Sequence, residues 1–136
     1  MKRRPYEFID HTADIKVKVH GADLTEIFEN SVLAISEYLS PERKIESKRI
    51  KTINVQGLDI KALLYNLIEE LLYLIDAESF APASASLILR GNNLKAEVSG
   101  DNSSKYHLKQ IKAPTYAEME IKKLDNQWIA QFVLDV

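Results

Sequence analysis

The sequence predicts a single domain with an α+β fold: a mainly antiparallel β-sheet or sheets and two packed α-helices, in the order β-α-β-α and then a β-meander. Two segments with helical periodicity, each preceded by a capping aspartate, alternate with short strand-like segments in the first part of the chain. The rest shows only strand periodicity and turn signals. The 136 residues, 46% hydrophobic and 28% charged, suit one globular domain spanning residues 1–136.

Composition excludes several classes of site. With no cysteine, the chain has no zinc-thiolate site, thiol nucleophile or disulfide, which leaves oxygen ligands and imidazole for metal binding. The longest mainly apolar run, Leu71–Ile75, is far shorter than the roughly 20 residues that span a bilayer, and no apolar signal segment follows Lys2-Arg3-Arg4. We therefore expect a cytoplasmic protein without a membrane partner. A net charge of −2 favours an indirect role with RNA, because a protein that holds RNA through phosphate contacts is expected to be basic.

The first helix has the clearest boundaries. Tyr6–Ile9 is apolar-rich, and Lys16–His20 alternates polar and apolar residues as a half-buried strand does. Asp23 and Glu26 then form a capping-box pattern, and apolar residues recur at helical spacing over Leu24–Leu39. These signals predict a helix that begins after Asp23.

The second helix follows another strand. Ile45–Val55 alternates loosely and stops at Gly57, which indicates a strand. Asp59 is in position to cap the next segment, Ile60–Ile75, whose apolar residues cover a wide stripe. We expect this helix to be the central core helix.

The remaining chain reads as a meander. The small residues of 81–86 indicate a connection within the domain. Strands are predicted at 87–90 and 94–98, joined by a turn at 91–93, and another turn is predicted at 100–104.

Three more strands are predicted, at Tyr106–Ile111, Thr115–Lys122 and Trp128–Val133, with the last hairpin turn at 124–127. Pro114 has no amide hydrogen to donate, so it must lie at a bulge, an edge strand or a strand start.

Two acidic segments lie at opposite ends of the chain. In Asp10-His11-Thr12-Ala13-Asp14, two carboxylates flank an imidazole; bunched carboxylates repel unless they have a raised pKa, a cationic partner or a bound cation. Asp14 could equally serve a turn or cap, and His11 a structural hydrogen bond. At the other end, Asp135 and Val136 offer a side-chain and a terminal carboxylate, which are hard ligands for Ca²⁺ or Mg²⁺. A solvated chain end is the ordinary alternative, but the apolar strand 128–134 favours an ordered one.

Two basic features have ordinary alternatives. Lys112 is either a solvent-facing strand residue or a group that pairs with carboxylates or a phosphate. The segment Arg43–Lys51 is rich in Lys and Arg, which is typical of a solvated loop and strand face. The sequence contains no Gly-rich phosphate loop, HExxH or GxSxG pattern.

Five landmarks together resemble the archease family. They are His11–Ile15, the helix Leu24–Leu39 with Phe28-Glu29-Asn30, the helical segment Leu63–Tyr73, Lys112-Ala113-Pro114-Thr115-Tyr116 and the terminal Asp135-Val136. They occur in the family's order over the whole length. The chain differs at Lys16, where many relatives have glycine, at Pro114 in place of a β-branched residue, and at Ala117, which is often histidine.

The resemblance implies a function in tRNA splicing and RNA repair. It implies a protein that is not itself an enzyme but activates the GTP-dependent RNA-splicing ligase, by promoting guanylylation of the ligase's active-site histidine and multiple turnover. It also implies a divalent cation, Ca²⁺, held by Asp14, Asp135 and Val136, and an activating role for Lys112. His11 and Asp10 are candidates to support the metal ligands, and RNA is contacted only through the ligase.

Two other functions stay open from the residues alone. One is a metal-dependent hydrolase that uses Asp10, His11, Asp14 and Asp135, although no nucleophile and base occur at a recognised spacing. The other is a general chaperone or RNA-binding modulator in which the acidic residues are structural.

Overall fold

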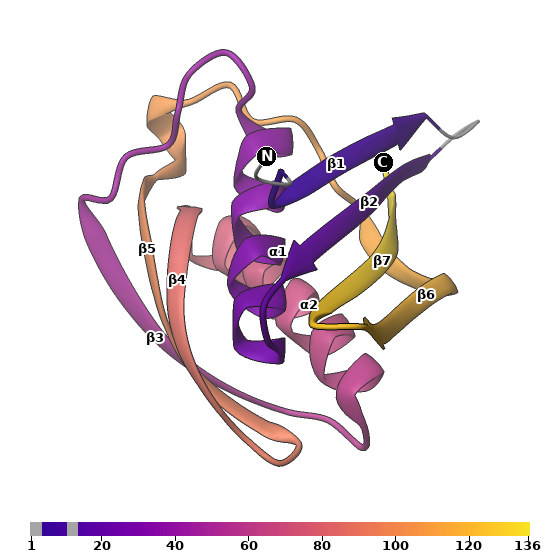
Figure 1. Ribbon diagram of the computed structural model, residues 1–136. Coiled ribbons are helices and arrows are strands. Elements are labelled where there is room, and N and C mark those ends of the chain that lie inside the picture. The colour runs from indigo at the N-terminus through magenta and orange to yellow at the C-terminus, as the bar shows by residue number, and fades with distance from the viewer. Residues whose placement is uncertain (1–3, 11–13) are drawn as a thin grey trace.

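Two antiparallel sheets enclose both helices in the computed structural model, which describes residues 4–10 and 14–136 (Figure 1). The four-stranded sheet has the order β1 (Tyr6–Asp10), β2 (Asp14–Gly21), β7 (Gln127–Asp135) and β6 (Ala113–Leu124). The three-stranded sheet has the order β3 (Arg49–Gln56), β5 (Asn93–Asn102) and β4 (Phe80–Arg90). The helices are α1 (Leu24–Leu39), α2 (Ile60–Glu78) and the 3₁₀ turn η1 (Ser103–Lys105). The α+β class is confirmed, with two strands before α1.

Both helices begin at the capping aspartates that the sequence predicts. Asp23 accepts a 2.8 Å hydrogen bond from the amide of Glu26, and the Glu26 carboxylate accepts one from the amide of Ala22. Asp59 accepts a 2.8 Å bond from the amide of Ala62. The bonds to Asp23 and Asp59 each satisfy an amide that the first helical turn leaves without an intrahelical partner.

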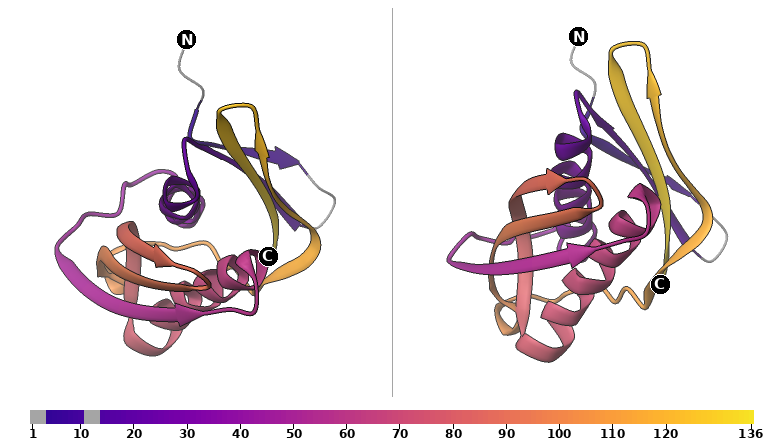
Figure 2. Two further views of the ribbon diagram at one scale, coloured as in Figure 1. Left: turned by 60° about the horizontal axis from the view of Figure 1, so that its bottom comes forward. Right: turned by 90° about the horizontal axis from the view of Figure 1, so that it is seen from below.

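The core lies between the two sheets. The helix α1 contacts β1, β2 and β7 on one side and β4 on the other, and α2 contacts β6 as well as β3 and β4, so each helix joins the two sheets (Figure 2). Phe28 of α1, Phe80 of β4 and Phe132 of β7 are fully buried together with the apolar stripe of α2. Burying a side chain of this size contributes about 1.5–3 kcal/mol, so this shared core fixes the sheets relative to each other.

The predicted connection at 81–86 is wrong, because these residues belong to β4. Ala81 and Ala83 are buried in the strand that contacts α1, and small side chains there let the helix approach closely. The predicted turn at 100–104 is also too long, since β5 continues to Asn102 before η1. A Cβ at Gly100 would lie 2.1 Å from the carbonyl oxygen of Ala81, so only glycine fits this pairing.

The predicted strand at Tyr106–Ile111 is wrong as well. No strand pairs with this segment: its backbone is held at separate points, where Lys109 donates to the carbonyl of Leu39. Likewise β3 begins at Arg49, later than the predicted Ile45, whose side chain is buried ahead of the strand. Pro114 pairs with Leu134 in β6, an edge strand, as its missing amide requires.

No helix of the described chain combines the length and hydrophobicity needed to cross a membrane.

Candidate metal site at three strand ends

The two acidic segments meet in the four-stranded sheet. The register of β2 and β7 places Asp14 directly opposite Asp135. Directly paired residues of antiparallel strands have Cα atoms about 4.5–5.5 Å apart and side chains on the same face. Residues of opposite ends of the chain therefore present two carboxylates side by side.

The face that they share points away from the core. Their neighbours Ile15 and Leu134, one step along each strand, also pair with each other and pack into the core. Because side chains alternate along a strand, Asp14 and Asp135 project from the opposite face. Asp14 is half-buried and Asp135 is exposed, so the pair is accessible to a ligand or partner.

Lys112 is joined to the same place through its backbone. Its amide donates a 2.7 Å hydrogen bond to the carbonyl oxygen of Asp135, and Ala113, the next residue, pairs with Asp135 in the ladder. The beginning of β6 thus lies beside the end of β7 and the beginning of β2. Lys112 is exposed, so its ammonium group is accessible to solvent.

The chain end is ordered as the apolar strand predicts. Val136 follows β7 and packs against the core. This contact, together with the pairing of Asp135 to strands on both sides, holds the terminus in the sheet.

The predicted supporting residues are only partly described. His11, with Thr12 and Ala13, lies outside the described residues. Asp10 pairs with Ile15 through the backbone of β1. The roles of His11 and Asp10 therefore stay predictions.

The chemistry of this donor set suits a hard cation. Asp14, Asp135 and the α-carboxylate of Val136 are all oxygen donors, the kind that Ca²⁺ and Mg²⁺ prefer. Within residues 4–10 and 14–136, no three His, Cys, Asp or Glu side chains are arranged to hold a metal ion. Two anions at paired positions repel, and a cation there removes the repulsion.

Lys16, one of the departures from the family pattern, has a partner in a bulge of β6. Residues 116–119 stand opposite the single residue Phe132, and Glu118 adopts a left-handed conformation with φ 61°. The ammonium nitrogen of Lys16 lies 2.8 Å from Oε1 of Glu118. Gln131 reinforces the bulge by donating a 2.9 Å bond to the carbonyl of Glu118. Lys16 therefore fits this local structure.

Ala117 and Tyr116 lie in the same bulge. The amide of Ala117 donates to the Thr115 hydroxyl. The Tyr116 ring stacks on Tyr65 of α2, with centroids 4.2 Å apart and planes within 2°, which ties the bulge to the helix. The pKa of Tyr65 is raised, mainly by burial and to a smaller extent by the nearby Glu69 carboxylate.

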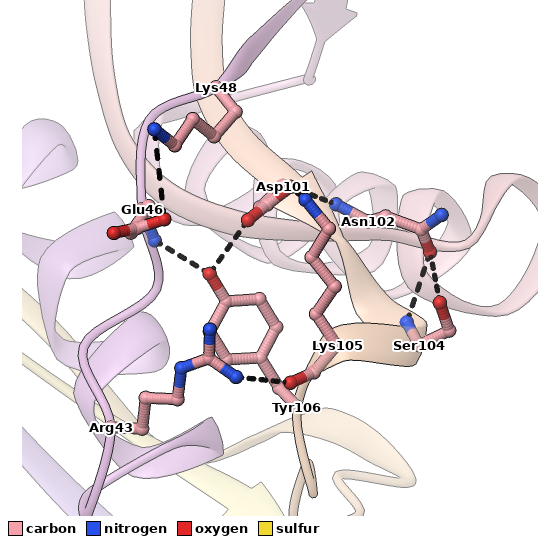
Figure 3. A network of polar contacts seen from close by, with 8 residues as sticks. All are labelled: Arg43, Glu46, Lys48, Asp101, Asn102, Ser104, Lys105 and Tyr106. Atoms are coloured by element: carbon pink, nitrogen blue, oxygen red, sulfur yellow. Dashed lines mark hydrogen bonds and ion pairs between the residues drawn. The ribbon is translucent and has the colours of Figure 1, made fainter.

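A second polar cluster, which the sequence analysis did not identify, lies where the loop after α1 meets η1 (Figure 3). Its centre is Asp101, only 1% exposed, which accepts a 2.8 Å hydrogen bond from the Tyr106 hydroxyl and lies 3.3 Å from the ammonium group of Lys105. Arg43 stacks 4.6 Å above the Tyr106 ring and donates to the carbonyl of Lys105. The basic segment 43–51 was the only sequence signal for it.

Comparison with known proteins finds relatives over nearly the whole chain. Residues 6–136 match the model of the archease protein family (MTH1598/TM1083). The chain is 38% identical to Protein archease of Thermococcus kodakarensis, covering 98% of this chain and 99% of that one, and 38% identical to that of Pyrococcus furiosus with the same coverage.

Solved structures agree with the fold. Protein 1598 of Methanobacterium thermoautotrophicum superposes with a TM-score of 0.78 at 26% identity, covering 97% of this chain and 99% of the other. An archease of Thermotoga maritima, described as a possible chaperone, superposes with a TM-score of 0.65 at 19% identity, covering 100% and 98%. The family model and the full-length relatives show that this chain belongs to the archease family.

Proposed function

We propose that this protein is a cytoplasmic activator of a GTP-dependent RNA-splicing ligase and has no catalytic cycle of its own. In this role it promotes guanylylation of the ligase's active-site histidine and so permits multiple turnover in tRNA splicing and RNA repair. Membership of the archease family supports the proposal, and the direct pairing of Asp14 with Asp135 carries it.

That pairing matters because it concentrates charge at an accessible edge of the molecule. Asp14 and Asp135 supply two carboxylates on one face, the terminus at Val136 supplies a third, and Lys112 is the adjacent cation. A site with this composition favours a divalent cation, for which we propose Ca²⁺. When bound, such a cation offers positive charge to phosphate oxygens.

The residues themselves have separate tasks in this proposal. Asp14 and Asp135 orient the cation toward the partner, because the sheet fixes their backbones. Lys112 contacts a nucleotide phosphate or balances the carboxylates, as a lysine ammonium does. Fixed charges aimed at a transferring phosphoryl group stabilise the charge that develops on it.

The test is ligase guanylylation, measured with radiolabelled GTP at limiting metal, and multiple-turnover ligation with Asp14→Ala, Lys112→Ala and Asp135→Ala. We expect each variant to lower activation at least about tenfold. Asp76→Ala and Lys61→Ala are matched controls, because both residues are exposed on α2 and make the same charge changes.

Other functions would give other outcomes. If all three folded site variants activate as well as the wild type, the site assignment fails. Hydrolysis of nucleotides or phosphoesters by the protein alone, lost in Asp14→Ala, would instead identify an enzyme. Prevention of aggregation of unrelated proteins, unaffected by the same variants, would support a chaperone, the role suggested for the Thermotoga maritima protein.

A further inference from the structure

A run of basic side chains leads toward the candidate metal site. Between η1 and β6, the side chains of Lys105, His107, Lys109 and Lys112 are exposed, whereas Tyr106 and Ile111 are buried. This alternation points the basic groups to solvent at nearly regular steps. We call Arg43 and these four residues the basic track.

The track is fixed at both ends and in the middle. At the beginning of the track, the Tyr106 hydroxyl donates a hydrogen bond to Asp101. In the middle, the amide of Lys109 donates a 2.9 Å hydrogen bond to the carbonyl of Leu39, and at the end the amide of Lys112 donates one to the carbonyl of Asp135. In Figure 1 the segment runs from η1 behind α1 to the beginning of β6. It therefore connects the Asp101 cluster to the metal site without a paired strand.

A cavity lies at the beginning of the track. It has a volume of about 410 Å³, and Arg43, Lys105, Tyr106 and Lys109 are among the residues that line it. Arg43 is held in place by its stacking on Tyr106 and by a 2.6 Å bond to the carbonyl of Lys105, which uses only one of its N–H donors. A guanidinium that is already oriented loses little entropy when it binds a phosphate.

Charge is distributed unevenly over the molecule. Residues 40–49 and 101–109 together contain six Lys and Arg against three Asp and Glu, an excess of three positive charges in a chain whose net charge is −2. The rest of the chain therefore has an excess of negative charge. The local excess of positive charge favours contact with a polyanion at these segments over the rest of the chain.

Aromatic rings lie beside the track. The ammonium nitrogen of Lys109 lies 5.1 Å from the centroid of the Tyr38 ring, and the Phe8 ring, 41% exposed, lies 6.2 Å from Tyr38. Cationic groups beside exposed rings are typical of proteins that bind single-stranded nucleic acid, in which phosphates meet the cations and bases stack on the rings.

We propose that the basic track binds the phosphodiester backbone of single-stranded RNA, with a base stacked against Phe8 and Tyr38, and directs the strand toward Asp14, Asp135 and Lys112. The direction of the strand rests on the proposed function, but the binding does not. An acidic protein surface would match the charges of the track, whereas a single-stranded nucleic acid matches the charges with its phosphates and the exposed ring with a stacked base.

Fluorescence anisotropy with a labelled single-stranded RNA oligonucleotide and the isolated protein tests the proposal. If three phosphates are contacted, a plot of the logarithm of the association constant against the logarithm of the salt concentration should have a slope of about −2. Removing two of the cations should make this slope shallower, at about −0.7. We expect Arg43→Ala/Lys109→Ala to weaken binding about tenfold, and Phe8→Ala to weaken it at least about fivefold. Lys61→Ala/Lys123→Ala, the same change on exposed lysines elsewhere, should leave it unchanged.

Several results would overturn the proposal. They are the absence of RNA binding by the wild type at low salt, equal binding by the track and control variants, or equal competition by polyglutamate together with no effect of Phe8→Ala. The last result would identify an acidic protein partner instead. Guanylylation is measured without RNA, so a failure to bind RNA leaves the proposed activation of the ligase untouched. Conversely, the activity of Asp14→Ala and Asp135→Ala in the guanylylation assay bears only on that activation.

Discussion

The Tyr106 hydroxyl donates a 2.8 Å hydrogen bond to Oδ2 of Asp101 and accepts a 3.0 Å bond from the amide of Glu46. One side chain therefore joins the end of β5 to the loop that follows α1. Its ring also supports Arg43. The relationship holds together two segments that are about 60 residues apart in sequence.

Removing this hydroxyl should destabilise the fold. Tyr106→Phe leaves a buried carboxylate and a backbone amide without a shared partner, and such losses are costly. We expect the melting temperature to fall by about 3–8 °C. Tyr73→Phe is the matched control, since Tyr73 is 55% exposed, and it should change the melting temperature little. Equal melting temperatures for the two variants in differential scanning calorimetry would contradict this account of the cluster.

Asp101 should also give the protein a sensitivity to acid. Burial alone raises the pKa of Asp101, but the hydrogen bonds from Tyr106, the Asn102 amide and Lys105, with the charge of Lys105, outweigh it and lower the pKa below its usual value. Since the folded pKa is below the unfolded value of about 3.9, the contribution of Asp101 to stability is present above that pH.

This contribution is lost as the pH falls below about 4 through the folded pKa. Urea unfolding between pH 6 and about 2.5 should therefore show a steeper loss of stability for the wild type than for Asp101→Asn. If the two profiles have the same slope, with both proteins folded at neutral pH, Asp101 does not act in this way.

The chain end gives a third prediction. A few residues added after Val136 leave its side chain in the core but remove its α-carboxylate from the site. We expect such an extension to weaken Ca²⁺ binding about tenfold, because affinity follows the number of charged ligands. Isothermal titration calorimetry measures this effect. An extension before Met1 is the control, and equal Ca²⁺ affinities for the two extended proteins would reduce Asp135 and Val136 to an ordinary chain end.

Local signals in the sequence were enough for the helices. Asp23 and Asp59 cap their helices because the capping interaction involves only residues three positions apart. The partnership of Asp14 with Asp135 came from the family resemblance, and the sheet register agrees with it.

Long-range contacts account for the elements that were predicted wrongly. The small residues Ala81 and Ala83 lie in a strand because this segment pairs with β5, a distant part of the chain that no neighbouring residue signals. Tyr106–Ile111 was predicted to be a strand, but no other strand pairs with it. Asp101 lies in the segment predicted to be a turn, and its role in the cluster depends on contacts with Tyr106 and Lys105 that the local sequence does not reveal.

The bulge in β6 has a consequence for how the protein meets other chains. The four-stranded sheet ends at β6, and an uninterrupted edge there would accept an extra strand from another molecule. Residues 116–119 break the regular sequence of donors and acceptors, and Lys16 and Glu118 place charge at the same point. The outer edge is therefore a poor template for strand addition by another molecule.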